Sequence, residues 1–191
     1  MADPGITHWV GVKRVLGYLR GTSNYGLVFV GDDNDTLVGY SDSDWAGDQV
    51  TRRSTSGYIF QFGNSTISWS SRRQATVAKS STEAEYVALS MAAQEAIWLR
   101  RLLKDIGVGV DHATTIHEDN QGAIQLSRNP KHHNRTKHVD VSFHFTRERI
   151  LTKEIDVSYV PTDHNLSDIM TKGLSRVSYQ KFRDLLGVQS C

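Results

Sequence analysis

The chain has 191 residues and a formal net charge of +1; 38% of its residues are hydrophobic and 23% are charged. A chain of this size buries about 70% of the surface that it exposes when unfolded, so we expect one main domain with a proper core. The balanced charge excludes a uniformly basic chain, and any surface for nucleic acid must therefore be local. No apolar run approaches the ~20 residues that a membrane span needs, so no contact with a membrane is expected.

The single cysteine, Cys191, excludes an intrachain disulfide bond. This suits a reducing, intracellular setting. Residues 1–5 lack the basic and apolar regions of a signal peptide, and we interpret them as a tag remnant.

A helix is predicted over residues 8–20, because apolar residues recur there near helical spacing, and Gly21 favours its end. The sequence GDDND at residues 31–35 is typical of a break between units. We therefore expect residues 1–35 to hold the tag remnant and a connecting segment, and residues 36–191 to form the main domain.

Three strands are predicted next, over residues 36–42, 56–63 and 65–71. The second and third are joined at Gly63-Asn64, a pair that favours a tight hairpin turn. This order predicts a three-stranded antiparallel meander.

The longest predicted helix, residues 82–105, carries one continuous apolar stripe. The stripe contains Leu89, Ala92, Ala96, Leu99 and Leu103. We expect it to lie in the core, together with Trp69 and Trp98.

The rest of the chain alternates between strands and helices. Strands are predicted over residues 114–119 and 155–161, and helices over 120–127, 139–150, 166–172 and 176–186. The whole order predicts an α/β fold with a mixed sheet of five strands, three antiparallel and then two further ones, flanked by helices.

Four acids stand where predicted strands end or helices begin: Asp42, Glu85, Asp119 and Asp168. Glu85 lies on the apolar stripe of its helix and should face the sheet, where a carboxylate costs several kcal/mol unless it is compensated. Converging acids also repel one another. Divalent ions such as Mg²⁺ or Mn²⁺ resolve both problems, since they favour carboxylate oxygens.

Each acid also fits an ordinary structural role. Thr82 and Glu85 match a capping box, in which Glu85 caps its own helix. Asp168 would compensate the dipole of the first helical turn, and Asp42 and Asp119 would be turn acids after strands. The metal-binding interpretation depends on the set rather than on any single residue.

The segments around these acids are similar to one known family. They are YSDSDWAGD, RRSTSGYIF, SSTEAEYVALSMAAQEAIWLRRLL, HEDNQGAI, HNRTKHVDVSFHF and YVPTDHNLSDIMTKGL. Together they resemble the ribonuclease H region of copia-type retrotransposon Pol polyproteins, from about residue 36 to residue 186. The upstream HWVGVKRVLGYLRGTSNYGLVF resembles the segment that joins reverse transcriptase to ribonuclease H in those polyproteins.

The resemblance implies a ribonuclease H-like fold and a tetrad of metal-binding, catalytic acids. By position these are Asp42, Glu85, Asp119 and Asp168. Asp44, two residues further along the same strand face, is the rival for the first position.

The resemblance also implies contacts to nucleic acid. Ser81 and Thr82, just before the helix acid, would contact sugar edges or else cap the helix, and Gln121 would contact the substrate or be a plain helix residue. Arg135 and Lys137 would bind phosphates or belong to a solvated basic loop.

His164 lies in the loop before the last acid and would be a proton shuttle, although its spacing departs from that of cellular relatives. A histidine cluster at His132, His133, His138 and His144 has no cysteine nearby and irregular spacing, so a zinc site is not expected there.

The function implied is hydrolysis of the RNA strand of RNA–DNA hybrids during reverse transcription, by two Mg²⁺ ions for which Mn²⁺ can substitute. The implied partners are the hybrid and the reverse transcriptase domain of the same polyprotein. An alternative from a different class stays open: a catalytically weak or silent domain that binds hybrid or serves as a structural module for its polymerase.

Overall fold

The computed structural model describes residues 4–31, 35–128 and 137–190, and the side chains of residues 137–143 lie outside this description. At its centre is a five-stranded mixed sheet with the strand order β4-β3-β2-β5-β6. The strands are β2 (Leu37–Asp44), β3 (Thr55–Phe62), β4 (Ser65–Arg73), β5 (Thr114–Glu118) and β6 (Ile155–Tyr159). The first three are antiparallel, whereas β5 and β6 join β2 in parallel. The predicted sheet is therefore confirmed.

The hairpin between β3 and β4 turns at the predicted pair. Gly63 and Asn64 both have positive φ angles, 52° and 59°. Two such residues in succession give the tight turn whose twist matches that of antiparallel strands.

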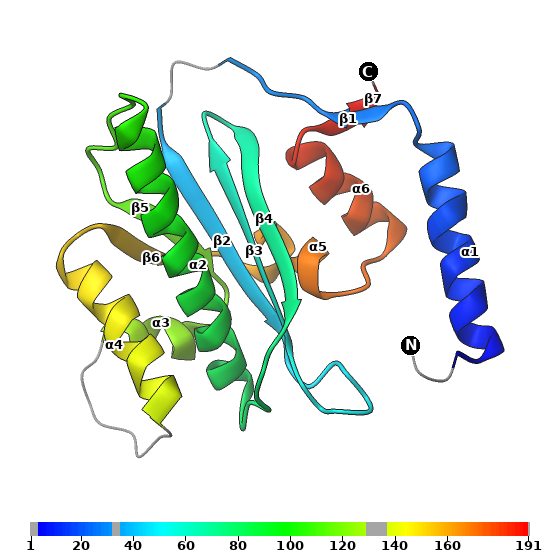
Figure 1. Cartoon of the computed structure of the whole chain (residues 1–191), viewed down its shortest axis with the longest axis horizontal. Helices are drawn as coiled ribbons and strands as arrows, with labels where there is room; N and C mark the ends of the chain where they lie inside the picture. Colours follow the sequence, from blue (N-terminus) through cyan, green and yellow to red (C-terminus); the bar gives the residue numbers. More distant parts are fainter. Residues whose placement is uncertain (1–3, 32–34, 129–136, 191) are drawn as a thin grey trace.

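Helices cover both faces of the sheet (Figure 1). On one side lie α2 (Ser81–Asp105), α3 (Gln121–Arg128) and α4 (Lys137–Leu151). On the other lie η1 (Thr162–His164), a single 3₁₀ turn, with α5 (Asp168–Thr171) and α6 (Arg176–Leu185).

Neighbouring residues of β3 show how the two layers are filled. Phe60 is fully buried in the larger core with Leu89 of α2, whereas Ile59 is fully buried in a smaller core with Phe182 of α6. Successive side chains of a strand point to opposite faces, so a single strand supplies both cores. The predicted α2 stripe from Leu89 to Leu103 is buried throughout.

The prediction that Trp69 and Trp98 lie in the core is wrong, because they are 55% and 54% exposed. Trp98 lies nine residues after Leu89, which is half a turn out of phase with the apolar stripe, so it faces away from the sheet. Trp69 lies on β4, the edge strand.

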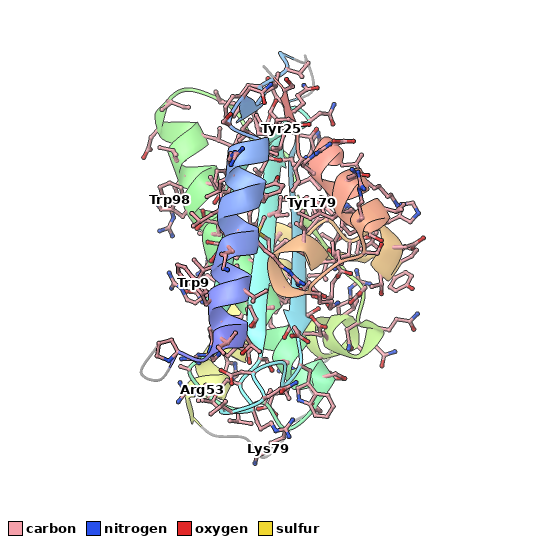
Figure 2. The ribbon with its side chains drawn as sticks, turned by 90° about the vertical axis from the view of Figure 1, so that its right-hand side faces the viewer. Trp9, Tyr25, Arg53, Lys79, Trp98 and Tyr179 are labelled. Carbon is pink, nitrogen blue, oxygen red and sulfur yellow. The ribbon has the colours of Figure 1, made fainter. Side chains whose placement is uncertain are left out.

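The N-terminal part is placed beside the C-terminal end of the chain. Strand β1 (Tyr25–Leu27) pairs antiparallel with β7 (Val188–Ser190), a small sheet that the sequence did not predict because three residues show no periodicity. Helix α1 (Ile6–Gly21) has no buried residue. Its Tyr18 accepts a 2.7 Å hydrogen bond from the Tyr179 hydroxyl of α6, beside which α1 stands in Figure 2.

One face of α1 is a continuous apolar stripe, here called the α1 stripe. It consists of Trp9, Val12, Val15, Leu16 and Leu19, each between 36% and 59% exposed. None of the described helices is both long and apolar enough to cross a membrane.

Candidate metal centre

Three acids from separate parts of the chain meet at one edge of the sheet. Asp42 lies near the end of β2, Asp119 directly follows β5, and Glu85 lies in the second turn of α2. One carboxylate oxygen of each lies within 4.8 Å of those of the other two. Because β2 and β5 are adjacent and parallel, their carboxyl ends share an edge, which explains how residues 77 positions apart are brought together.

Asp168, at the start of α5, lies at the same edge and is linked to Asp42 by a lysine. The Nζ atom of Lys172 lies 2.9 Å from Oδ1 of Asp42 and 3.0 Å from Oδ1 of Asp168. The Thr171 hydroxyl donates a hydrogen bond to the other oxygen of Asp42. Asp168 thus stands outside the group of three acids but shares Lys172 with one of them.

Two features of the backbone allow α5 to approach the sheet so closely. A Cβ atom at Gly57 of β3 would lie 2.7 Å from side-chain atoms of both Met170 and Thr171, so only glycine fits there. The Asn165 side chain donates a 2.9 Å hydrogen bond to the carbonyl oxygen of Ser41. The turn before α5 is thereby fixed to β2.

Asp44, the rival for the first acid, has different surroundings. It lies on β2 as expected, but a Cβ atom built on Gly47 would lie 1.8 Å from its Oδ2 atom. Its carboxylate is therefore packed against the loop that follows the strand. Asp42, not Asp44, belongs to the group of three acids.

Glu85 does not cap its helix. The N-cap of α2 is Ser80, whose hydroxyl accepts a 3.2 Å hydrogen bond from the backbone N–H of Glu83. Glu85 is only 6% exposed, and its Oε2 atom has no hydrogen-bond partner among the described residues. Burial, and then the nearby charges of Glu118 and Asp42, raise the pKa of Glu85 far above its usual range.

Sequence reasoning missed two charged residues here, Glu118 and Lys172. Glu118 is fully buried and accepts hydrogen bonds from the Ser41 hydroxyl at 2.6 Å and the Asn120 backbone at 3.1 Å. Burial raises the pKa of its carboxyl group. Glu118 lies two residues after the buried Ile116, on the same face of β5, and this spacing was the signal that could have found it.

For Lys172 the missed signal was its position four residues after Asp168, where helical side chains meet. Burial alone would lower the pKa of Lys172, but the charges and hydrogen bonds of Asp42 and Asp168 outweigh burial and raise it.

The residues predicted to contact nucleic acid are partly brought together. Ser81 and Thr82 open α2, and Gln121 opens α3. A Cβ atom at Gly122 would lie 2.9 Å from the Thr82 hydroxyl, so the two helix N-termini are in close contact. Arg135 lies outside the described residues, as does the side chain of Lys137, the first residue of α4.

The predicted proton shuttle, His164, is exposed and lies in η1 rather than among the acids. Its neighbour Thr162 donates a 2.5 Å hydrogen bond to Oδ2 of Asp119, so η1 itself contacts the group. Of the histidine cluster, His132 and His133 lie outside the described residues, as does the side chain of His138, and His144 is exposed.

Comparison with known proteins finds relatives of this chain, although no family model matches it. The retrovirus-related Pol polyprotein from transposon TNT 1-94 of Nicotiana tabacum is 41% identical over 190 residues, 100% of this chain. The Pol polyprotein from transposon RE2 of Arabidopsis thaliana is 42% identical over 188 residues, 98% of this chain. The chain is homologous to the copia-type retrotransposon Pol polyproteins. It spans only 14% and 13% of the length of these two relatives.

The fold of this Pol segment is that of ribonuclease H. The crystal structure of LC11-RNase H1 in complex with an RNA/DNA hybrid matches it with a TM-score of 0.52 at 14% identity, covering 71% of this chain and 94% of that one. At such an identity the likeness concerns the fold, and the role of each side chain rests on the geometry above.

Proposed function

We propose that this Pol segment is a metal-dependent endonuclease that hydrolyses the RNA strand of RNA–DNA hybrids. The observation that carries the proposal is the meeting of Asp42, Glu85 and Asp119 within 4.8 Å, from three elements remote in sequence. The similar LC11-RNase H1 was crystallised with an RNA/DNA hybrid, which supports the same substrate class here.

The residues fit a pair of divalent cations. A buried carboxylate oxygen without a partner, Oε2 of Glu85, is costly in a metal-free site and becomes favourable beside a cation. Asp42, Glu85 and Asp119 would hold one ion, and Asp42 with Asp168 would hold a second. Mg²⁺ is the expected metal, with Mn²⁺ as a substitute; when bound, the pair would activate the attacking water and stabilise the departing 3′ oxygen.

The surrounding side chains keep the carboxylates in position. Thr162 orients Asp119, and Thr171 orients Asp42, each through a hydrogen bond from its hydroxyl group. Such fixed partners let a site act without reorganising during the reaction. His164, two residues after Thr162, remains the proposed group for moving a proton.

A basic surface beside the acids would bind the hybrid's phosphates; we call it the basic loop surface. It consists of Arg52 and Arg53 from the loop after β2, Arg72 near the end of β4 and Lys79 from the loop before α2. The half-exposed Trp45 opens the first of these loops. The Trp45 side chain donates a 3.2 Å hydrogen bond to the carbonyl oxygen of Ala78, which ties the loop after β2 to the loop before α2. Arg53 and Lys79 lie at the same end of the molecule in Figure 2.

Sequence selectivity is not expected from this surface, because arginine and lysine contacts to phosphates are independent of base identity. Selectivity for a hybrid would come from Ser81, Thr82 and Gln121 at the paired helix N-termini, which are suited to the 2′-hydroxyl groups of the minor groove. Arg135 and Lys137 remain predicted phosphate contacts.

The α1 stripe favours a second role that accompanies the first. An exposed apolar helix face is typical of an interaction site, and we propose the reverse transcriptase part of the same polyprotein as its partner. If the segment depends on this partner to bind its substrate, it would be weakly active or inactive when tested alone.

The deciding experiment is cleavage of a hybrid whose RNA strand is labelled, with Mg²⁺, by the full chain and by Asp119→Asn. We expect the full chain to cut the RNA strand only and the variant to be inactive, with single-stranded RNA as a negative control. Equal cleavage by the variant would exclude this site, and no cleavage even with the reverse transcriptase part added would favour a silent module.

A further inference from the structure

Lys172 occupies the space between two acids that the proposed function assigns to a metal ion. Its Nζ atom is nearly equidistant from Oδ1 of Asp42 and Oδ1 of Asp168, at 2.9 and 3.0 Å. The Asp42 side chain is fully buried and that of Asp168 is 8% exposed. The ammonium group is therefore the cation that neutralises this pair of carboxylates in the metal-free protein.

The two halves of the acidic site differ in this respect. Asp42, Glu85 and Asp119 converge on one another, and the Oε2 atom of Glu85 has no hydrogen-bond partner among the described residues. Asp42 and Asp168 are instead joined by Lys172, and the second oxygen of Asp42 accepts a hydrogen bond from Thr171. One half is free to receive a cation, and the other already holds one.

The lysine is placed so that it can leave. Its side chain is 33% exposed, in contrast to the two carboxylates that it contacts. A lysine carries its charge on a flexible four-carbon stem, so its ammonium group can move into water while α5 stays in place.

We propose that Lys172 is a built-in counter-ion that holds Asp42 and Asp168 together before metal binds and is displaced when the second divalent ion enters. The inference rests on the proposed function for the identity of the two ion positions. Its consequence is that the two ions bind unequally. At the position formed by Asp42, Glu85 and Asp119 the ammonium group contacts only one of the three acids, whereas at the position formed by Asp42 and Asp168 it contacts both. An ion at the second position therefore competes with the ammonium group more strongly than an ion at the first.

The test is calorimetric titration of the full, metal-free chain with Mn²⁺, without nucleic acid. We expect two classes of ion in the wild type that differ in affinity by at least about tenfold, the size of effect that about 1.4 kcal/mol produces. Lys172→Gln should strengthen the weaker class about tenfold or more and the tighter class much less, because the ammonium group contacts both acids of the weaker position and only one acid of the tighter one. Lys104→Gln makes the same charge change in the last turn of α2 and should leave both classes unchanged.

Lys172→Arg guards against a Lys172→Gln protein that fails to fold. It keeps a cation between the two acids, so its weaker class should stay as weak as in the wild type or become weaker. A weaker class unaffected by Lys172→Gln, strengthened by Lys172→Arg, or absent from both variants would overturn the inference.

Failure of this inference can be told from failure of the proposed function. Strengthened Mn²⁺ binding in Lys172→Gln, in a chain that cuts no hybrid, would support the counter-ion and contradict the nuclease. Hybrid cleavage by the wild type, with no effect of Lys172→Gln on Mn²⁺ binding, would support the nuclease and contradict the counter-ion.

Discussion

Asp42 and Asp44 lie two residues apart on the same strand, yet their carboxylates have different neighbours. Asp42 meets Glu85 and Asp119, whereas Asp44 is packed against Gly47 in the loop after the strand. A shared strand face therefore does not give the two acids a shared role.

Asparagine at each position should separate these roles. Asp42→Asn should lower the rate of hybrid cleavage by about 100-fold or more, because it removes a charge that both ions require. Asp44→Asn should stay within about threefold of wild type, since it changes only a contact in the loop. The rates are measured at saturating Mg²⁺, after circular dichroism has shown both variants to be folded. A larger loss in Asp44→Asn than in Asp42→Asn would reverse the assignment.

Glu85→Gln should make the metal-free protein more stable. The pKa of Glu85 is raised by burial and by neighbouring acids, so ionisation at neutral pH favours the unfolded chain. Removing the charge should raise the melting temperature in EDTA by several degrees, at about 2–4 °C per kcal/mol for a chain of this size. The same variant should lose the stabilisation that Mg²⁺ gives the wild type.

The stabilisation by Glu85→Gln should depend on pH in one direction. A carboxyl group with a raised folded-state pKa destabilises the fold above its ordinary value of 4.5, where the unfolded chain is ionised. The gap between the two melting curves should therefore close as the pH falls below about 4.5 and widen toward neutral pH. A gap that is largest at acidic pH would contradict a raised folded-state pKa for Glu85.

Gly57→Ala should displace α5 from the sheet. Its new methyl group would lie 2.7 Å from Met170 and Thr171, closer than side chains tolerate. Overpacking of this kind costs about 1–3 kcal/mol and should also lower cleavage, because Thr171 and Asp168 move with α5. Gly173→Ala is the matched control, since no atom lies within 4 Å of its added Cβ. Thermal melts and cleavage rates of both variants check the prediction; equal effects would contradict it.

The basic loop surface should set the salt dependence of hybrid binding. Replacing both Arg53 and Arg72 by glutamine should weaken binding and reduce the slope of log affinity against log salt by about one per lost phosphate contact. Arg101→Gln, on the exposed side of the distal half of α2, should leave the slope unchanged. Binding is measured by fluorescence anisotropy in Ca²⁺, and an unchanged slope in the double variant would place the phosphate contacts elsewhere.

The α1 stripe should be needed for contact with the reverse transcriptase part. Trp9→Ser with Leu16→Ser should weaken their association about tenfold or more, because large apolar side chains dominate such interfaces. The unfolding temperature of the isolated chain should hardly change, since both residues are more than half exposed. Co-purification that is undiminished by the double variant would show that another surface carries the contact.

The sequence predicted most of the fold because its signals were periodic. The meander, the long helix with its stripe and the later strands all have enough residues for a period to show. Strands β1 and β7 have three residues each and no such pattern. Trp98 illustrates the opposite error, in which residue type suggested the core although helical phase placed the side chain outside.

The candidate site was predicted in its acids and missed in their partners. Strand ends and helix starts can be located from sequence, and four acids mark them. Glu118 could have been found, since it lies two residues after the buried Ile116 on the same face of β5. That Lys172 lies beside two of these acids depends instead on how α5 docks across the sheet, which Gly57 permits through a contact between residues more than a hundred positions apart. Such a long-range contact produces no periodic pattern in the sequence.

The most direct measurement is the anomalous difference density of crystals soaked in Mn²⁺, for the wild type and for Asp119→Asn. We expect a peak at roughly 2–2.5 Å from carboxylate oxygens of Asp42, Glu85 and Asp119, lost or weakened in the variant. Density at none of these oxygens, in crystals whose three carboxylates lie together as described, would contradict it.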